Sequence, residues 1–181
     1  MRLVCHESAY DRLLADLALH TLDIVIADAP VPSGSSVRAY NHLLGETGIS
    51  FFATQSLAAG HRRGFPKSLD GAPMLLPLEN LTLRRSLNQW FERHDIKPQV
   101  IAEFEDSALL KVFGGDGVGI FPAPTVMEAE VSRNYDVRVV GRVPEVRERF
   151  YAISMERKLK NPAIVAITDA ARHEIFSSKA P

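Results

Sequence analysis

Apolar residues in the N-terminal part of the chain fall into short continuous runs separated by a helically spaced set. Residues 22–27 form an apolar run that ends at Asp28 and predicts a buried strand. Residues 1–5 form a similar run, and we predict a buried strand there as well. Four leucines between residues 13 and 19 follow at near-helical spacing. Strand, helix and strand in this order are typical of a β-α-β unit in a parallel sheet.

The same alternation continues to the C-terminus and predicts an α/β fold class. Further strands are expected over residues 37–44, 48–54, 74–76, 100–104, 118–121, 137–140 and 150–154. Helices are expected over residues 81–94 and 106–113, after Pro122 and Pro124, and from Asn161-Pro162 onward. The polar break at residues 45–47 predicts either a hairpin or an interdomain hinge.

Composition and charge narrow the class of protein. The 181 residues are 46% hydrophobic and 24% charged, with a net charge of -1, so the basic excess of a nucleic-acid binder is missing. Short basic clusters at residues 61–63, 84–85 and 142–149 are predicted to be solvated surface. No apolar stretch reaches the ~18 residues of a membrane span, and no signal peptide is visible. We therefore expect a cytoplasmic protein without a membrane partner.

The single cysteine, Cys5, cannot form an internal disulfide, which fits a reducing compartment. It lies in the apolar run of residues 1–5. We therefore predict a buried structural thiol, because an apolar site raises the thiol pKa.

The motifs of enzymes are missing from the sequence. The six histidines lack the spacing of a metal pair, and neither a Gly-x-Ser-x-Gly elbow nor a phosphate loop is found. The glycine-rich residues 114–119 precede a predicted strand instead of following one, so they predict a helix end and a turn. We predict no catalytic residues and no enzyme. An enzyme on this fold would need a histidine within hydrogen-bond reach of Ser107 or Thr82.

Polar residues stand where several predicted helices begin after a strand. Ser8, Thr82 and Asp106 are either helix caps or, if they converge on one cleft, part of a binding site. Carboxylates gather at the same places, at Glu7, Asp11, Asp28, Glu105 and Asp106. Because clustered like charges repel, such a set with backbone carbonyls predicts a site for a hard cation such as sodium. A small organic anion at the helix N-termini is the alternative ligand.

The order of these segments resembles the effector-binding domain of LysR-type transcriptional regulators. The matching segments are residues 13–27, 73–76 with 81–91, 107–113 with 117–122, and 161–163. Residues 88–91, 103–109, 120–125 and 140–143 are similar to one branch of the family, the NhaR-type activators of sodium/proton antiporter genes.

The resemblance implies a two-lobed fold of the type 2 periplasmic-binding-protein class. Lobe I would hold residues 1–44 and 147–181, lobe II residues 45–146, and two crossovers near Gly45 and Pro144 would form the hinge. An effector would bind between the lobes, lined by Glu7, Ser8, Asp28, Pro30, Thr82, Glu105, Asp106 and Ser107. Sodium, the one ion expected as an effector, would have Glu7, Asp11, Asp28 and Asp106 as candidate ligands, and no cofactor is expected.

The implied function is effector sensing in a regulator that activates sodium/proton antiporter genes in response to sodium. Implied partners are a small-molecule or ion effector, further copies in a dimer or tetramer, and RNA polymerase. DNA would bind only through a winged helix-turn-helix domain, which this chain lacks. The first β-α unit of the effector domain is also expected before Met1, which would leave a sheet edge open to association. A stand-alone small-solute-binding protein of the same fold is the alternative, but such a protein would need export.

Overall fold

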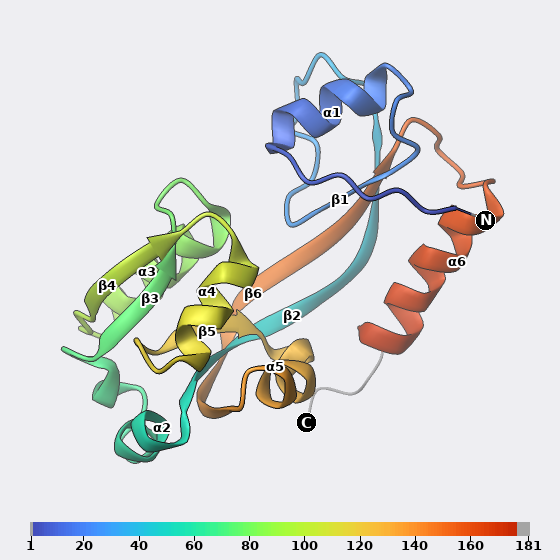
Figure 1. Ribbon diagram of the computed structural model, residues 1–181. Coiled ribbons are helices and arrows are strands. Elements are labelled where there is room, and N and C mark those ends of the chain that lie inside the picture. The colour runs from blue at the N-terminus through green and yellow to red at the C-terminus, as the bar shows by residue number, and fades with distance from the viewer. Residues whose placement is uncertain (1, 177–181) are drawn as a thin grey trace. The chain divides into compact units, whose positions relative to one another are not determined.

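The computed structural model describes residues 2–176, and their contacts divide the chain into two compact units (Figure 1). Among the described residues, unit 1 combines 2–46 with 149–176, and unit 2 is Thr47–Glu148. Two long strands, β2 (Tyr40–Thr54) and β6 (Val137–Ser154), run across both boundaries. The chain therefore passes between the units twice.

Unit 1 is built on a short strand and two helices. Strand β1 (Val25–Ala27) pairs antiparallel with β6, with Val25 opposite Ile153. Helix α1 (Tyr10–Ala18) buries Leu14 and Leu17 in the same cluster as Val25 and Ile153. Helix α6 (Pro162–Ala170) starts at Asn161, whose side chain accepts from the Ala163 N–H at 3.0 Å, and a π-helical turn, η3 (Ala171–Ile175), continues it. The predicted start of this helix is confirmed.

Unit 2 contains a parallel strand pair. Strand β3 (Pro73–Pro77) pairs with β4 (Gln99–Phe104), and α3 (Thr82–Arg93) and α4 (Ser107–Gly115) follow the two strands in turn. Strand β5 (Phe121–Pro124) pairs antiparallel with β2. The remaining elements are α2 (Gln55–Arg62), η1 (Lys67–Leu69), η2 (Thr125–Met127) and α5 (Glu128–Asn134). The hydrogen-bonded strand orders are β1-β6-β2-β5 and β3-β4.

Large aromatic residues form the core of unit 2. Helix α3 buries Leu87, Trp90 and Phe91, which share one helical face and pack against Phe51 of β2. A second cluster forms around Phe52 and Phe121, whose stacked rings have centroids 5.6 Å apart. The predictions for β3, β4, α3 and α4 are confirmed to within a few residues.

The N-terminal residues differ from their prediction. Residues 2–9 have no regular structure, Leu3 and Val4 are exposed, and Cys5 is exposed as well, so the predicted strand and buried thiol are wrong. An apolar run forms a strand only where another strand satisfies its backbone N–H and C=O groups. Here β1 finds that partner in β6, and because the pair is antiparallel the predicted parallel β-α-β unit is wrong too.

Two pairs of predicted strands prove to be single strands. The predicted runs at 37–44 and 48–54 join in one strand, β2, which begins only at Tyr40. Residues 45–47 continue this strand, so the predicted hairpin is wrong. The runs at 137–140 and 150–154 likewise join in β6. The prediction that Pro122 and Pro124 open a helix is wrong, because both lie in β5. β5 is an edge strand, where proline is tolerated. Helical structure begins only at Thr125.

None of the helices within residues 2–176 is both long enough and apolar enough to cross a membrane.

Two glycines near the ends of their helices allow a matched test of packing in unit 2. A Cβ added to Gly114 in α4 would clash with the Phe121 ring, whereas one added to Gly60 in α2 would meet nothing within 4 Å. Gly114→Ala should lower the free energy of unfolding by about 1–3 kcal/mol through overpacking. Gly60→Ala should raise it by about 0.5–1 kcal/mol, because alanine loses less backbone entropy in a helix.

Urea unfolding of both variants, followed by circular dichroism, measures the two effects. Equal changes in the two variants would show that Phe121 does not press on α4.

Candidate functional site

The carboxyl ends of β3 and β4 bring two helix starts to one edge of the parallel pair. Pro77 lies opposite Phe104 in the register, and the Leu78 N–H donates to the Phe104 carbonyl at 3.0 Å. Helix α3 begins at Thr82 and α4 at Ser107, each a few residues beyond its strand. The backbone N–H groups of a helix's first turn have no partner within the helix, so this edge offers hydrogen-bond donors.

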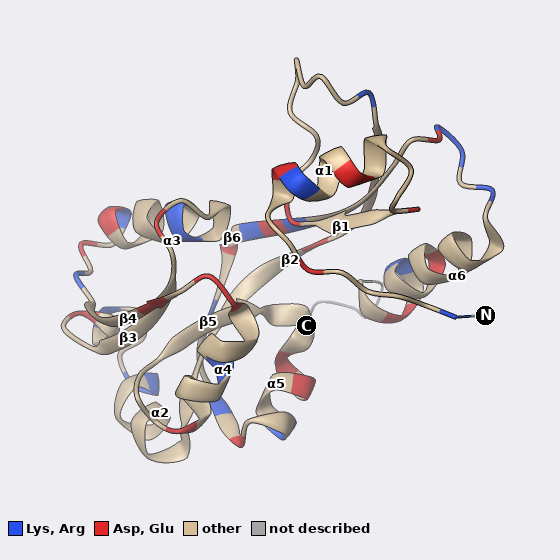
Figure 2. Ribbon diagram, turned by 45° about the horizontal axis from the view of Figure 1, so that its top comes forward, with Lys and Arg blue, Asp and Glu red and all other residues tan. Residues whose placement is uncertain are grey.

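The predicted site residues of unit 2 lie at this edge. The Asp106 carboxylate accepts from the Ala108 N–H at 2.6 Å, which confirms Asp106 as the cap of α4. Glu105 and Ser107 are exposed on either side of it, and Figure 2 shows an acidic segment between β4 and α4. Thr82 is exposed as the first residue of α3, but the cap position is Leu81 and makes no side-chain bond, so the predicted capping role of Thr82 is wrong.

A buried arginine at this edge contradicts the prediction of solvated surface. Arg84 is 5% exposed, and its Nη1 donates to the Pro77 carbonyl at 2.8 Å and to Glu103 Oε1 at 2.5 Å. Its Nε donates to Asn88 Oδ1 at 2.9 Å. The sequence held a signal for this, because Arg84 lies three residues before Leu87 and therefore on the apolar face of the helix.

Two predicted residues of unit 1, Asp11 and Asp28, act electrostatically on Tyr10. The Tyr10 hydroxyl donates to the Ala29 carbonyl at 3.3 Å, in the turn that runs from Asp28 to Pro30 after β1. Burial raises the pKa of Tyr10, and the negative charges of Asp11 and Asp28 raise it further. Asp11 and Asp28 thus act on the same hydroxyl, next to a backbone carbonyl.

Glu7 and Ser8 lie just before α1 in exposed, irregular chain. The cap position of α1 is Ala9 and makes no side-chain bond, so the predicted capping role of Ser8 is wrong. Within residues 2–176, no three His, Cys, Asp or Glu side chains form a group that could hold a metal ion. Convergence of the residues of unit 1 and unit 2 on one cleft stays a prediction.

Unit 1 also contains a cavity of about 200 Å³ away from these residues. Its walls come from the end of α1, the chain before β1, the chain after β6 and the start of α6, and include Leu17, Ser154 and Asn161. None of the predicted site residues is among its lining residues.

The histidines of both units with assigned bonds have structural partners. His42 bonds Ser154 at 3.0 Å, His61 bonds the Leu57 carbonyl at 2.9 Å and His94 bonds the Trp90 carbonyl at 2.9 Å. These contacts are structural.

The arrangement at the ends of β3 and β4 offers caps, carbonyls and N–H groups, which are suited to binding a ligand.

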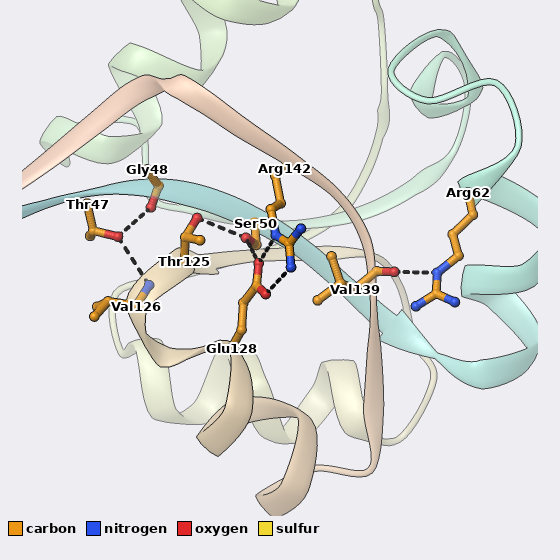
Figure 3. Close-up of polar contacts among 9 residues, drawn as sticks. All are labelled: Thr47, Gly48, Ser50, Arg62, Thr125, Val126, Glu128, Val139 and Arg142. Atoms are coloured by element: carbon orange, nitrogen blue, oxygen red, sulfur yellow. Dashed lines mark hydrogen bonds and ion pairs between the residues drawn. The ribbon is translucent and has the colours of Figure 1, made fainter. Parts of the chain in front are cut away.

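A polar cluster holds the turn after β5 against β2 in unit 2 (Figure 3). Arg142 grips Glu128 with two hydrogen bonds of 2.7 and 2.8 Å, and the buried Ser50 hydroxyl donates to Glu128 at 2.5 Å and meets Thr125 at 2.9 Å. The Thr47 hydroxyl accepts from the Val126 N–H at 3.1 Å. The cluster therefore fixes β2 where it enters unit 2.

The stability that this cluster provides depends on pH through the carboxyl group of Glu128. Burial alone would raise the pKa of Glu128, but hydrogen bonds from Arg142 and Ser50 and the charge of Arg142 lower it below its usual value. A lowered pKa means that the contact stabilises the fold fully above the ordinary carboxyl pKa, and that this stability is lost as pH falls through the lowered value. Glu128→Gln should therefore flatten the loss of stability in the acid range.

Urea midpoints of Glu128→Gln and wild type between neutral and acid pH measure this difference. Glu130→Gln, on the same helix, is the matched control and should keep the wild-type slope. An unchanged slope in Glu128→Gln would rule out the assigned role of Glu128.

Comparison with known proteins gives one family and a consistent fold. The model of the LysR substrate binding domain matches residues 1–175. The chain is 33% identical over 177 residues to the transcriptional activator protein NhaR of Escherichia coli, and equally to that of Shigella flexneri. The match covers 98% of this chain and 58% of each relative, so the chain spans a little over half of their length.

Solved structures with a similar fold are regulatory domains. The apo regulatory domain of HypT from Salmonella typhimurium superposes with a TM-score of 0.67 at 17% identity, over 91% of this chain and 79% of that one. The effector binding domain of QuiR in complex with shikimate gives 0.59 at 15% identity, over 96% and 81%. These likenesses confirm the predicted α/β, periplasmic-binding-protein-like fold class.

Proposed function

Because the chain belongs to the family of LysR substrate-binding domains, we propose that it senses sodium and controls a regulator that activates sodium/proton antiporter genes. The family is one of effector-binding domains of transcription regulators and not a class of enzymes. The observation that carries the proposal is the 33% identity to a transcriptional activator, NhaR, along 98% of the chain. The similarity of residues 103–109 and 120–125 to the antiporter-activator branch supports sodium as the signal.

The chemistry of the Tyr10 turn supports a cation as the ligand. Hard cations prefer carboxylate and carbonyl oxygens. The carboxylates of Asp11 and Asp28 and the Ala29 carbonyl are oxygens of this kind; the carbonyl bonds the Tyr10 hydroxyl, and the two charges act on it. A bound cation would relieve the repulsion between the two negative charges. We propose Glu7 and Asp106 as further ligands, with Ser8, Pro30, Thr82, Glu105 and Ser107 lining the site.

Sensing requires two states of the domain with different affinity for the ion. A ligand shifts an equilibrium only by the difference between its affinities for the two states. We propose that sodium binding changes the relation between unit 1 and unit 2, and that the change is passed to DNA-binding domains in the whole protein. DNA would bind through the part of the relatives that this chain does not span, beside further copies of the protein and RNA polymerase in the cytoplasm.

A small organic anion is the second candidate effector. The starts of α3 and α4 direct N–H groups to one edge of β3 and β4, where the helix dipoles favour negative charge. The similarly folded QuiR domain was solved with shikimate, a ligand of this class. A stand-alone solute-binding protein remains the alternative class; an upstream reading frame that encodes a signal peptide instead of a helix-turn-helix would favour it.

Sodium should stabilise the chain beyond the effect of salt alone. At a sodium concentration ten times the Kd, binding adds about 1.4 kcal/mol to the free energy of unfolding, so Tm rises with sodium chloride. Choline chloride at equal ionic strength is the control for screening. Asp28→Asn and Asp106→Asn should weaken the sodium-specific shift, and asparagine keeps the cap of α4.

Asp136→Asn is the matched variant, because Asp136 is 92% exposed and asparagine tolerates its left-handed backbone at φ 48°. It should respond as wild type does. Equal shifts with sodium and choline would contradict sodium sensing, and a shift with shikimate alone would favour the organic anion.

A further inference from the structure

We propose that Arg84 is a positioning residue that holds the two turns of the candidate site in unit 2. Each turn is counted with the first residue of the helix that follows it: residues 78–82 between β3 and α3, and residues 105–107 between β4 and α4. That these turns contact an effector rests on the proposed function, whereas their dependence on Arg84 follows from its contacts alone.

One side chain connects three elements at this edge. Arg84 is the third residue of α3, and its Nη1 reaches back to the carbonyl of Pro77, the last residue of β3, at 2.8 Å. The same nitrogen donates to Glu103, the residue before the end of β4, at 2.5 Å. Its Nε is held within α3 by Asn88 at 2.9 Å. The position of α3 is therefore tied to the ends of both strands.

Burial distinguishes Arg84 from an ordinary surface ion pair. Its side chain is 6% exposed, against 39% for Glu103 and 78% for Glu79, whose Oε1 lies 3.9 Å from Nη2. A desolvated guanidinium depends on its partners, because losing one leaves a buried charge without compensation. Only the planar guanidinium, with five N–H donors in a fixed fork, can serve Pro77, Glu103 and Asn88 together.

The turns themselves are short, so a shift of either strand end reaches the helix starts. The Leu78 N–H donates to the Phe104 carbonyl and the Leu81 N–H donates to the Leu78 carbonyl, each at 3.0 Å. On the other turn, the Ala108 N–H donates to the Asp106 side chain, and the Leu110 N–H to the Asp106 carbonyl at 3.1 Å. A binding site tolerates displacements of only about 0.5 Å.

The double variant Arg84→Met/Glu103→Leu separates positioning from stability. Apolar side chains can replace a buried ion pair with little loss of stability, so its urea midpoint should return toward the wild-type value after the large loss in Arg84→Met alone. The hydrogen bonds of Arg84 to the strand ends that carry the turns are still gone. The amides of Leu78, Leu81, Ala108 and Leu110 should therefore exchange with deuterium about tenfold faster than in wild type.

Two further variants keep the test decisive if the double variant does not fold. Glu103→Gln keeps the shape but not the charge, and should speed exchange at Ala108 and Leu110. It should also speed exchange at Leu78, whose N–H donates to Phe104 beside Glu103, while Leu81 stays protected. Arg93→Met, an exposed arginine on the same helix, should leave all four amides as in wild type. Wild-type exchange rates in both Arg84→Met/Glu103→Leu and Glu103→Gln would overturn the positioning role.

The Tm of the same proteins, measured during titration with sodium chloride and with choline chloride, tests whether Arg84 affects sodium sensing. The sodium-specific rise in Tm should be lost in a double variant of wild-type stability. A wild-type sodium response in that variant would overturn the link to the site. No sodium response in wild type, with fast exchange in the variants, would refute the proposed function and leave the positioning role supported.

Discussion

The parallel pairing of β3 with β4 is the constraint on which the candidate site of unit 2 depends. Parallel strands require a crossover connection, and here α3 provides it, from the end of β3 back to the start of β4. Both strands consequently end at the same edge, and both following helices begin there. Trp90 and Phe91 of α3 pack on Phe51 and keep the crossover helix against the core. The position of the polar edge thus depends on the packing of the crossover helix against the core.

Two arginine–glutamate pairs show how burial changes what a charge does in this fold. The Arg142 side chain is 53% exposed, so water screens its ion pair with Glu128. The buried Ser50 hydroxyl makes the hydrogen bond to Glu128 that is shielded from water. The Arg84 side chain is 6% exposed and has protein partners on three elements. Screening weakens the first pair as salt rises, and it weakens the second less, because the Arg84 side chain is buried even though Glu103 is partly exposed.

Sequence predicts the elements whose signals are local. The apolar face of α3, the Asp106 cap and the Asn161-Pro162 start are each written within a few consecutive residues, and the structure has all three. Residues 2–5 and β1 carry equally apolar runs, yet only β1 pairs, because pairing depends on β6, more than a hundred residues away. Helix α2 was missed because only Ala58 is buried and Gly60 weakens the helical pattern. The spacing of Arg84 from Leu87 places it on the buried face of α3, but its charge led to the prediction of an exposed side chain.

The two sets of predicted site residues favour opposite ligands, and this difference limits what can bind to each. The turn after β1 presents oxygens, with the charges of Asp11 and Asp28 acting together on Tyr10. The starts of α3 and α4 present N–H donors, although Asp106 uses its carboxylate to satisfy one of them. A cation gains from the first set and from the Asp106 carboxylate, whereas the N–H donors of the second set favour an anion, since helix N-termini disfavour positive charge. Family membership fixes the fold and the class of function, but it does not choose between these charges. A few side chains decide whether a cation or an anion binds. Removing the charge of Asp28 or of Asp106 should distinguish the two ligands most clearly, because it weakens the binding of a cation and not that of an anion.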